Sequence, residues 1–269
     1  MVSEREAMRL PRLRPVIGVV ELHGMIGAGV RASTLFYLLD QVERSPRIGA
    51  VLLDIDSPGG GAAASEDIYF KVMRLRKKKP VVAYIRGMGA SGGYMAACAA
   101  SKIVALPGSL VGSIGVISMR PVLVQLMERL GVGVSINKSS PLKDMGAFYR
   151  PSTPDEEARL QAIVDELYVQ FVERVAAGRG MTADQARQYA TGEVFTGAKA
   201  KEMGLVDQVG DYDDAVDMAA SLGNTPRKTA HIRPPRSMRM RLLERFAVWA
   251  ATGVLEEVEP LLSKRLWYM

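Results

Sequence analysis

The sequence is poor in the residues that form disulfides and metal sites. Among 269 residues it has one cysteine, Cys98, and two histidines, His23 and His231. A lone cysteine cannot form an internal disulfide, and no CxxC motif or cluster of cysteine and histidine indicates a bound metal. Cys98 lies among small residues at 95–100, a setting that favours a buried, unreactive thiol. We therefore expect no metal and no cofactor.

The sequence also lacks a long apolar run. No apolar stretch separates the basic residues near the N-terminus from Pro11, so neither a signal peptide nor a membrane-spanning helix is predicted. The apolar stretch at 246–255 is shorter than the roughly 20 residues that span a bilayer. We expect this chain to be cytoplasmic or bound peripherally to a membrane.

Aromatic residues are scarce, at 6% of the chain, while the formal net charge is +6. Basic clusters lie at 5–14, 74–79 and 227–241. None of them is interleaved with the aromatic side chains that stack on bases, so no nucleic-acid partner is expected. The clusters favour solvated helix faces or contact with anionic lipid.

Apolar runs of strand length alternate with helical patterns through most of the chain. The run at 48–55 is continuous, as in a strand buried on both faces of a parallel sheet. The alternation predicts an α/β fold with right-handed crossovers and a mostly parallel sheet. Strands are predicted at 16–22, 48–55, 81–85, 102–105, 114–118 and 134–136, and helices at 62–77, at 122–130 and after caps at Ser33, Ser91, Thr153 and Thr182.

Composition divides the chain into four parts. Residues 1–15 form a basic, flexible lead-in, 16–223 a single α/β domain, and 224–236 a linker rich in proline and arginine. Residues 237–269 are predicted to form a basic amphipathic C-terminal helix with Trp249 on its apolar side. Such a helix would lie in a membrane interface, or else dock on its own domain or on a neighbouring subunit.

The most informative segment is Gly-Met-Gly-Ala-Ser-Gly-Gly-Tyr at 87–94, which follows a predicted strand and opens a helix. A serine between glycines at such a turn has little side-chain cover. Ser91 could therefore meet a substrate, and the amides at the helix start could receive an oxyanion. Taken alone, the run would also fit a glycine-rich turn with a serine helix cap. A second glycine-rich run at 56–61 and a lysine-bearing loop at 137–144 favour a serine–lysine peptidase.

A serine hydroxyl needs a base before it becomes a good nucleophile. Residues 89–93 match G-x-S-x-G, so a serine–histidine–acid hydrolase with His231 as its base is one alternative. Lysine is the other base. An ordinary lysine, with a pKa of about 10.4, is neutral in only about one molecule in two thousand at pH 7, so a lysine base must be partly buried. Lys138 and Lys143 both lie in the sparsely charged loop, and spacing does not choose between them.

These segments resemble those of a known family. Over roughly 15–221 the chain is similar to the short, single-domain form of signal peptide peptidase A, a membrane-linked serine–lysine peptidase. The resemblance implies the Clp protease/crotonase fold, with repeated β-β-α units and a mostly parallel sheet. The matching motifs are Asp-Ser-Pro-Gly-Gly-Gly at 56–61, Ala-Ser-Gly-Gly-Tyr at 90–94, Val-Gly-Ser-Ile-Gly-Val-Ile at 111–117, Lys-Ser-Ser-Pro-Leu-Lys-Asp at 138–144, Arg-Gly-Met-Thr at 179–182 and Gly-Leu-Val-Asp at 204–207.

The resemblance implies a role for individual residues. Ser91 corresponds to the nucleophile, Lys143 rather than Lys138 to the general base, and Ser113 to the serine that orients the base. The backbone N–H groups of Gly60 and Gly92 correspond to the oxyanion hole. From the residues themselves, Ser57 and Ser65 are interpreted as turn and helix-start residues, and Asp144 as a loop or ion-pair residue.

The implied activity is that of a serine endopeptidase, which hydrolyses apolar peptides such as cleaved signal peptides through an acyl-enzyme. The family forms rings or domes in which the lysine approaches the serine of an adjacent protomer, so a homo-oligomer is expected. Two departures are the absence of an N-terminal anchor and Ser140-Pro141-Leu142 where a glycine is common. A crotonase-type enzyme that holds a thioester enolate, and an inactive ring-forming partner or membrane scaffold, are the alternatives.

Overall fold

A computed structural model gives the fold and describes residues 14–234. The first compact unit of the chain ends at Ile232. The predicted lead-in at 1–15 lies almost wholly outside the described residues, and the predicted C-terminal helix at 237–269 lies entirely outside them. Within residues 14–234, no helix is long and apolar enough to cross a membrane.

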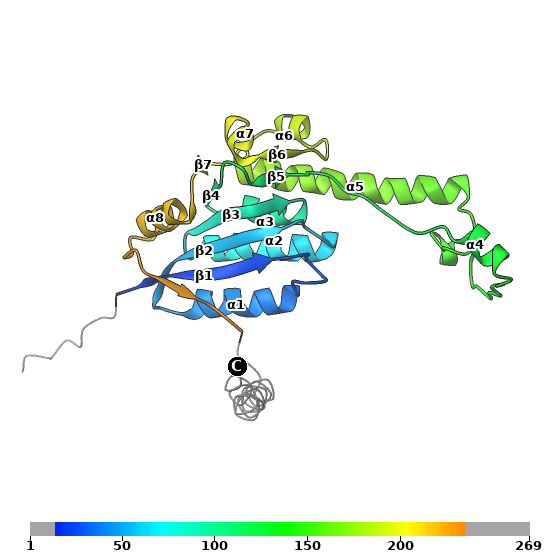
Figure 1. The fold of residues 1–269 in the computed structure, drawn as a ribbon, viewed down its shortest axis with the longest axis horizontal. Coiled ribbons are helices and arrows are strands. Elements are labelled where there is room, and N and C mark those ends of the chain that lie inside the picture. Colours follow the sequence, from blue (N-terminus) through cyan, green and yellow to red (C-terminus); the bar gives the residue numbers. More distant parts are fainter. Residues whose placement is uncertain (1–13, 235–269) are drawn as a thin grey trace, which may run out of the picture. The chain divides into compact units, whose positions relative to one another are not determined.

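An eight-stranded sheet forms the centre of this unit (Figure 1). Six strands follow one another in the order β6-β5-β3-β2-β1-β8, while β4 pairs with both β3 and β7. All strand pairs are parallel except β5 with β6, which confirms the prediction of a mostly parallel sheet. The strands are β1 (Val16–His23), β2 (Ile48–Ser57), β3 (Val81–Ala90), β4 (Lys102–Ala105), β5 (Leu110–Gly112), β6 (Val194–Thr196), β7 (Gln208–Val209) and β8 (Thr229–His231).

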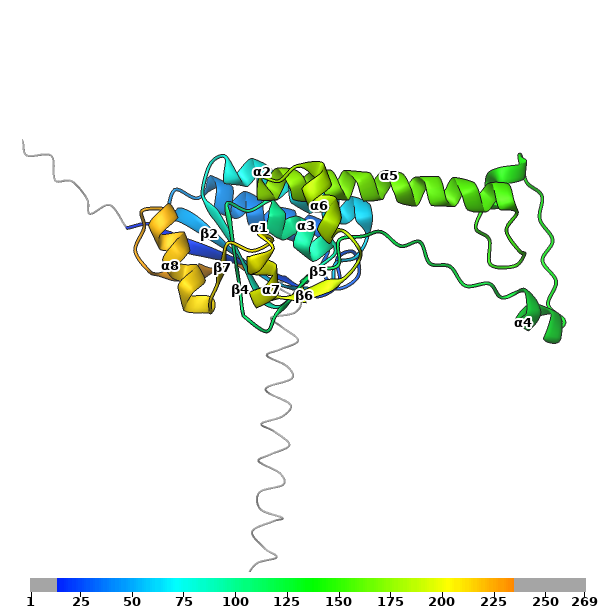
Figure 2. The same cartoon turned by 90° about the horizontal axis from the view of Figure 1, so that it is seen from above.

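Helices cover both faces of the sheet, which explains the continuous apolar run of β2. The larger core lies between the sheet and the helices α1, α2, α3 and α5, and a smaller core lies beneath α8 on the other face (Figures 1 and 2). Residues from Ala50 to Ile55 are all buried, as a central parallel strand requires. The α-helices of the body are α1 (Ala32–Arg44), α2 (Ala62–Arg76), α3 (Gly92–Cys98), α5 (Pro154–Arg179), α6 (Ala183–Tyr189), α7 (Gly197–Glu202) and α8 (Tyr212–Leu222).

Side-chain caps mark where four of these helices begin, namely α5, α6, α7 and α8. Thr153 and Thr182 each form a capping box with the residue three positions on, as their sequences predict. The prediction of a cap at Ser33 was wrong. Helix α1 begins at Ala32 after Arg31, without a side-chain cap, and the burial of its apolar face against the sheet stabilises it instead.

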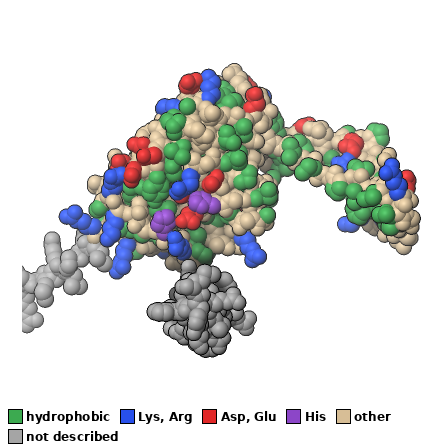
Figure 3. All heavy atoms as spheres, in the orientation of Figure 1, with side chains coloured by type: hydrophobic (Ala, Val, Ile, Leu, Met, Phe, Trp, Pro, Cys, Tyr) green, Lys and Arg blue, Asp and Glu red, His purple; other side chains and the backbone are tan. Residues whose placement is uncertain are grey.

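The first half of α5 extends beyond the sheet and carries an arm formed by residues 115–152 (Figures 1 and 2). The arm contains α4 (Val124–Arg129) and the short 3₁₀ helix η1 (Pro141–Asp144). Apolar side chains lie exposed on it (green in Figure 3), with Ile117 at 85% and Met119 at 88% exposure. The predicted strands at 114–118 and 134–136 are wrong, because these segments pair with no neighbouring strand.

The sheet extends into the segment that composition suggests is a linker. Within 224–236, β8 pairs in parallel with β1, and Val19 lies opposite His231. The pairing places His231 at the sheet edge, where its Nδ1 lies 3.0 Å from Oε1 of Glu21. The folded unit therefore continues past the predicted domain boundary at 223.

Candidate active site

Ser91 lies where β3 ends and α3 begins. The register pairs Ala90 of β3 with Gly112 of β5, and the Ser91 amide donates to the Gly112 carbonyl at 2.8 Å. Ser91 has φ = 50° and ψ = −124°, a backbone conformation that costs a non-glycine residue roughly 1–3 kcal/mol. The packing on both sides of the turn holds this conformation, as is common for catalytic residues.

Ser113 occupies the matching position on the neighbouring strand. It follows Gly112 directly, just as Ser91 follows Ala90, so the two serines come after a paired position of β3 and β5. Its φ is 48°, and its amide donates to the Glu193 carbonyl at 2.6 Å. The pairing of two short strand ends therefore brings these serines to one place from 22 positions apart in sequence.

The loop at 56–61 packs against the turn that carries Ser91. A Cβ atom at Gly59 would lie 2.6 Å from the Gly92 nitrogen and 2.8 Å from the Ser91 Cβ, so only glycine fits. Gly92 is the first residue of α3, where an N–H has no acceptor within the helix. Among the described residues, neither the Gly60 nor the Gly92 amide donates to a backbone carbonyl. Both amides remain available as oxyanion donors.

A pocket of about 760 Å³ adjoins these groups. Its lining includes Ser91, Ser113, Gly60 and Gly92, so the structure brings together every predicted site residue except Lys143. Ser65 also lines it, but its Oγ donates to the Gly61 carbonyl at 2.9 Å. Ser57 is buried and donates to the Gly24 carbonyl at 2.7 Å. Ser57 is thus the buried last residue of β2, and Ser65 lies in the first turn of α2.

Lys143 lies apart from the pocket, on η1 of the arm. Its side chain is exposed and, among the described residues, it forms no ion pair. Lys138 differs, because its Nζ lies 2.8 Å from Oδ1 of Asp144. Within the described residues, Lys138 is therefore engaged with Asp144, and Lys143 is not.

Neither histidine adjoins Ser91. His231 pairs with Glu21 at the edge of the sheet, and Nε2 of His23 lies 3.5 Å from Oδ1 of the buried Asp54. Neither residue lines the pocket that contains Ser91. The geometry therefore does not support the serine–histidine–acid alternative.

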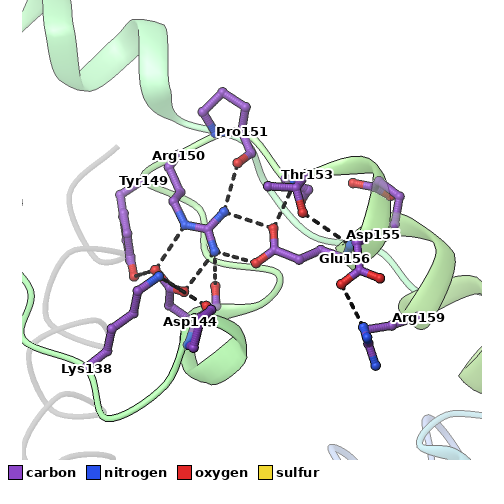
Figure 4. A network of polar contacts seen from close by, with 12 residues as sticks. Lys138, Asp144, Tyr149, Arg150, Pro151, Thr153, Asp155, Glu156 and Arg159 are labelled. Carbon is purple, nitrogen blue, oxygen red and sulfur yellow. Dashed lines mark hydrogen bonds and ion pairs between the residues drawn. The ribbon is translucent and has the colours of Figure 1, made fainter.

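A polar network holds the segment that carries Lys143 (Figure 4). Arg150 lies between two carboxylates, with Nη2 at 2.8 Å from Oδ1 of Asp144 and Nη1 at 2.9 Å from Oε2 of Glu156. Hydrogen bonds from Arg150, and then from Lys138, hold the pKa of Asp144 well below its usual range. Hydrogen bonds from Arg150 and from the Thr153 amide lower the pKa of Glu156 to about 2. Asp144 is therefore an ion-pair residue, as the sequence predicts.

Acidification is expected to loosen this network. Because both carboxyl groups have lowered pKa values in the folded chain, their stabilising effect is complete above the unfolded pKa values of about 4. It is lost as the pH falls toward the folded value of about 2 for Glu156. Amide hydrogen exchange over 138–152, corrected for its intrinsic pH dependence, should therefore become faster when the pH is lowered from 5 to 3. These two pH values lie about one unit above and below the unfolded pKa of about 4. Arg150→Met should remove most of this dependence, whereas Arg159→Met, which breaks an exposed pair with Asp155, should leave it unchanged.

Sequence reasoning missed the pocket wall formed by α2 and α5. Glu66 of α2 and Arg174 of α5 line the pocket, together with Met95 and Phe171. Their residue types signal only a charged helix surface and a core. The one available hint was the position of Glu66 just after the glycine-rich loop at 56–61.

Comparison with known proteins gives this site a family. The profile of peptidase family S49 matches residues 73–225, more than half of the chain. The chain belongs to peptidase family S49. This S49 peptidase is 40% identical over 232 residues to a putative protease of Synechocystis sp., a match that covers 85% of the chain and 83% of the relative. The recognition from motifs and the prediction of a serine protease are therefore confirmed.

Two further comparisons bear on the length and fold of the S49 peptidase. It is 35% identical over 201 residues to a chloroplastic serine protease of Arabidopsis thaliana, across 74% of this chain but only 30% of that relative. It also resembles the structure of a mutant membrane-bound stomatin-specific protease, with a TM-score of 0.53 and 18% identity. That match covers 82% of this chain and 99% of the other, and it confirms the predicted fold class.

Proposed function

We propose that this S49 peptidase hydrolyses peptide bonds with a catalytic dyad of Ser91 and Lys143. The observation that carries the proposal is the pocket, which gathers the Ser91 hydroxyl, Ser113 and the amides of Gly60 and Gly92. The resemblance in motifs assigns roles to the same residues and makes Lys143 the base. No histidine adjoins Ser91, so a lysine base accounts for the nucleophile best.

The proposed reaction has two stages. Ser91 Oγ attacks the carbonyl carbon of the peptide bond, and neutral Lys143 takes the hydroxyl proton. The oxyanion accepts hydrogen bonds from the Gly60 and Gly92 amides, and Lys143 returns the proton to the leaving amine. Water, deprotonated in turn by Lys143, then attacks the ester, and Lys143 returns that proton to Ser91 Oγ as the acid is released.

We infer that Lys143 acts on Ser91 of an adjacent copy of the chain. Most of the exposed large apolar side chains of residues 14–234 lie between 117 and 169, on the arm and the first part of α5. An apolar surface of this extent favours contact with another protein. Burial of Lys143 in such a contact would disfavour its charged form and so supply the neutral amine that the reaction requires.

The proposed substrates are extended apolar peptides, such as cleaved signal peptides. Met95, Leu167 and Phe171 give the pocket apolar walls that suit such side chains. We also propose a peripheral location at a membrane, where these peptides are released. The support for it is the composition of residues 237–269, which lie outside the described part of the chain.

A fluorophosphonate probe tests whether Ser91 is an activated nucleophile. We expect it to label the wild-type protein and Ser65→Ala, because the Ser65 hydroxyl is engaged with the Gly61 carbonyl. Ser91→Ala should lose the label, as read by mass spectrometry of the modified peptide. If the wild-type protein is folded and uncleaved at the arm but is not labelled, the result would favour the crotonase-type or scaffold alternative.

A further inference from the structure

Two charged residues line the pocket beside Ser91, and they pair with each other. Nη2 of Arg174 on α5 lies 2.9 Å from Oε1 of Glu66 on α2. All other lining side chains are uncharged. Among the described residues, neither partner forms an ion pair with a third group. Each is therefore the other's only ion-pair partner among the described residues.

Helix α2, which carries Glu66, also contacts the turn that carries Ser91. Ser65, the residue before Glu66, approaches Gly92 so closely that a Cβ there would lie 2.1 Å from the Ser65 Oγ. Glu66 is therefore next in sequence to Ser65, which contacts Gly92, the residue after Ser91. The lining that a substrate side chain would meet beside Ser91 includes Met95, Phe171 and this pair.

Arg174 is held in place by aromatic rings. Its guanidinium lies 4.9 Å from the ring centre of Phe70 and 5.7 Å from that of Tyr69, both on α2. Its Nε atom is buried and has no hydrogen-bond partner among the described residues. These contacts favour one position of the guanidinium on the pocket wall. Its charge is a constant feature of the wall.

We propose that the Glu66–Arg174 pair sets the charge specificity of the peptidase by keeping the pocket electrically neutral. This inference rests on the proposed cleavage at Ser91. An uncharged substrate side chain enters without disturbing the pair. A charged side chain must leave water and face one member of like charge, while the member of opposite charge is already engaged, so it is rejected.

The proposal predicts opposite changes when either half of the pair is removed. Glu66→Gln leaves the Arg174 cation uncompensated, so cleavage of a peptide with glutamate in the pocket should rise about tenfold or more relative to leucine. Arg174→Met leaves the Glu66 carboxylate uncompensated, so a lysine peptide should gain by a similar factor. The measurement is kcat/KM on peptides in which each position flanking the cleaved bond is varied in turn among leucine, glutamine, glutamate and lysine.

Two further variants control the experiment. Lys71→Met breaks ion pairs between α2 and α1 that lie outside the pocket, so it should keep the wild-type preference. The reversed pair, Glu66→Arg with Arg174→Glu, should restore the preference for uncharged side chains if neutrality is what matters. Thermal melting confirms that each variant is folded.

The outcomes separate this inference from the proposed function. Suppose that cleavage depends on Ser91, but that Glu66→Gln and Arg174→Met keep the wild-type preference among substrate side chains. That result would overturn the role of the pair and would not contradict the dyad. Cleavage that persists in Ser91→Ala would overturn the dyad and, with it, the inference. A shift of the same sign in both single variants would also contradict the proposed neutral pocket.

Discussion

Peptide cleavage is expected to fall by about 10⁴-fold or more in Ser91→Ala and in Lys143→Ala. The first variant lacks the attacking oxygen, and the second lacks the group that takes its proton. Because the members of a catalytic unit act together, the double variant should be hardly slower than either single one. Rates on an apolar peptide, measured at a fixed protein concentration, give these comparisons directly.

Lys138→Ala is the matched control for the base. Lys138 lies in the same loop as Lys143 but is paired with Asp144. The pair is partly exposed, so its loss should have little effect on the stability of the arm and leave cleavage near the wild-type rate. Loss of cleavage in Lys138→Ala, with full activity in Lys143→Ala, would reverse the assignment of the base.

Mixing the two inactive variants tests whether the dyad forms between copies of the chain. Neither Ser91→Ala nor Lys143→Ala has a complete site, but a mixed assembly can join Ser91 of one copy to Lys143 of another. If subunits combine at random in equal amounts, about a quarter of the sites should be intact. Recovery of activity on mixing, lost again when the mixture is diluted below the association threshold, is the expected result. Two folded, assembled variants that give no recovery would place the dyad within one chain.

The sequence predicted the body of the fold well because burial there follows simple patterns. The continuous run that becomes β2 has helices on both of its faces, and its apolar composition states this directly. The same rule failed at 114–118 and 134–136. Those segments also contain apolar residues, but all except the buried Ile114 lie on the arm, without a strand partner. An apolar run predicts that a segment is buried. It does not predict whether a sheet of the same chain or another protein buries it.

The turn that carries Ser91 was predictable for a different reason. The glycines around Ser91 and at 56–61 reflect close backbone contacts, such as that of Gly59 with Gly92, and these contacts bring the two motifs together. The ion pair of Glu66 and Arg174 left no such trace, because its members are 108 positions apart. Each looks like an ordinary charge on a helix. Only the fold, in which α3 packs against both α2 and α5, brings them together at the pocket.

The second large effect concerns the oxyanion hole. Gly60→Ala is expected to lower kcat by about 10²–10³-fold, the loss typical of one missing donor. Gly60 has φ = 154°, and a Cβ atom there would lie 2.0 Å from the Ile26 carbonyl oxygen. Because the obstacle is backbone, the loop must shift, and its amide must move away from the oxyanion. Gly108→Ala, where a Cβ atom meets nothing within 4 Å, is the matched control and should keep the wild-type rate.

Gly92→Ala should cause a similar loss, but one that a second substitution relieves. Its Cβ atom would lie 2.1 Å from the Oγ and 2.7 Å from the Cβ of Ser65, which are both side-chain atoms. Ser65→Gly removes them, so the double variant should recover much of kcat, whereas Ser65→Gly should not rescue Gly60→Ala. If Ser65→Gly does not rescue Gly92→Ala, then alanine at 92 itself, rather than its clash with Ser65, displaces the backbone N–H that would bind the oxyanion. Full activity in Gly60→Ala would remove its amide from the mechanism.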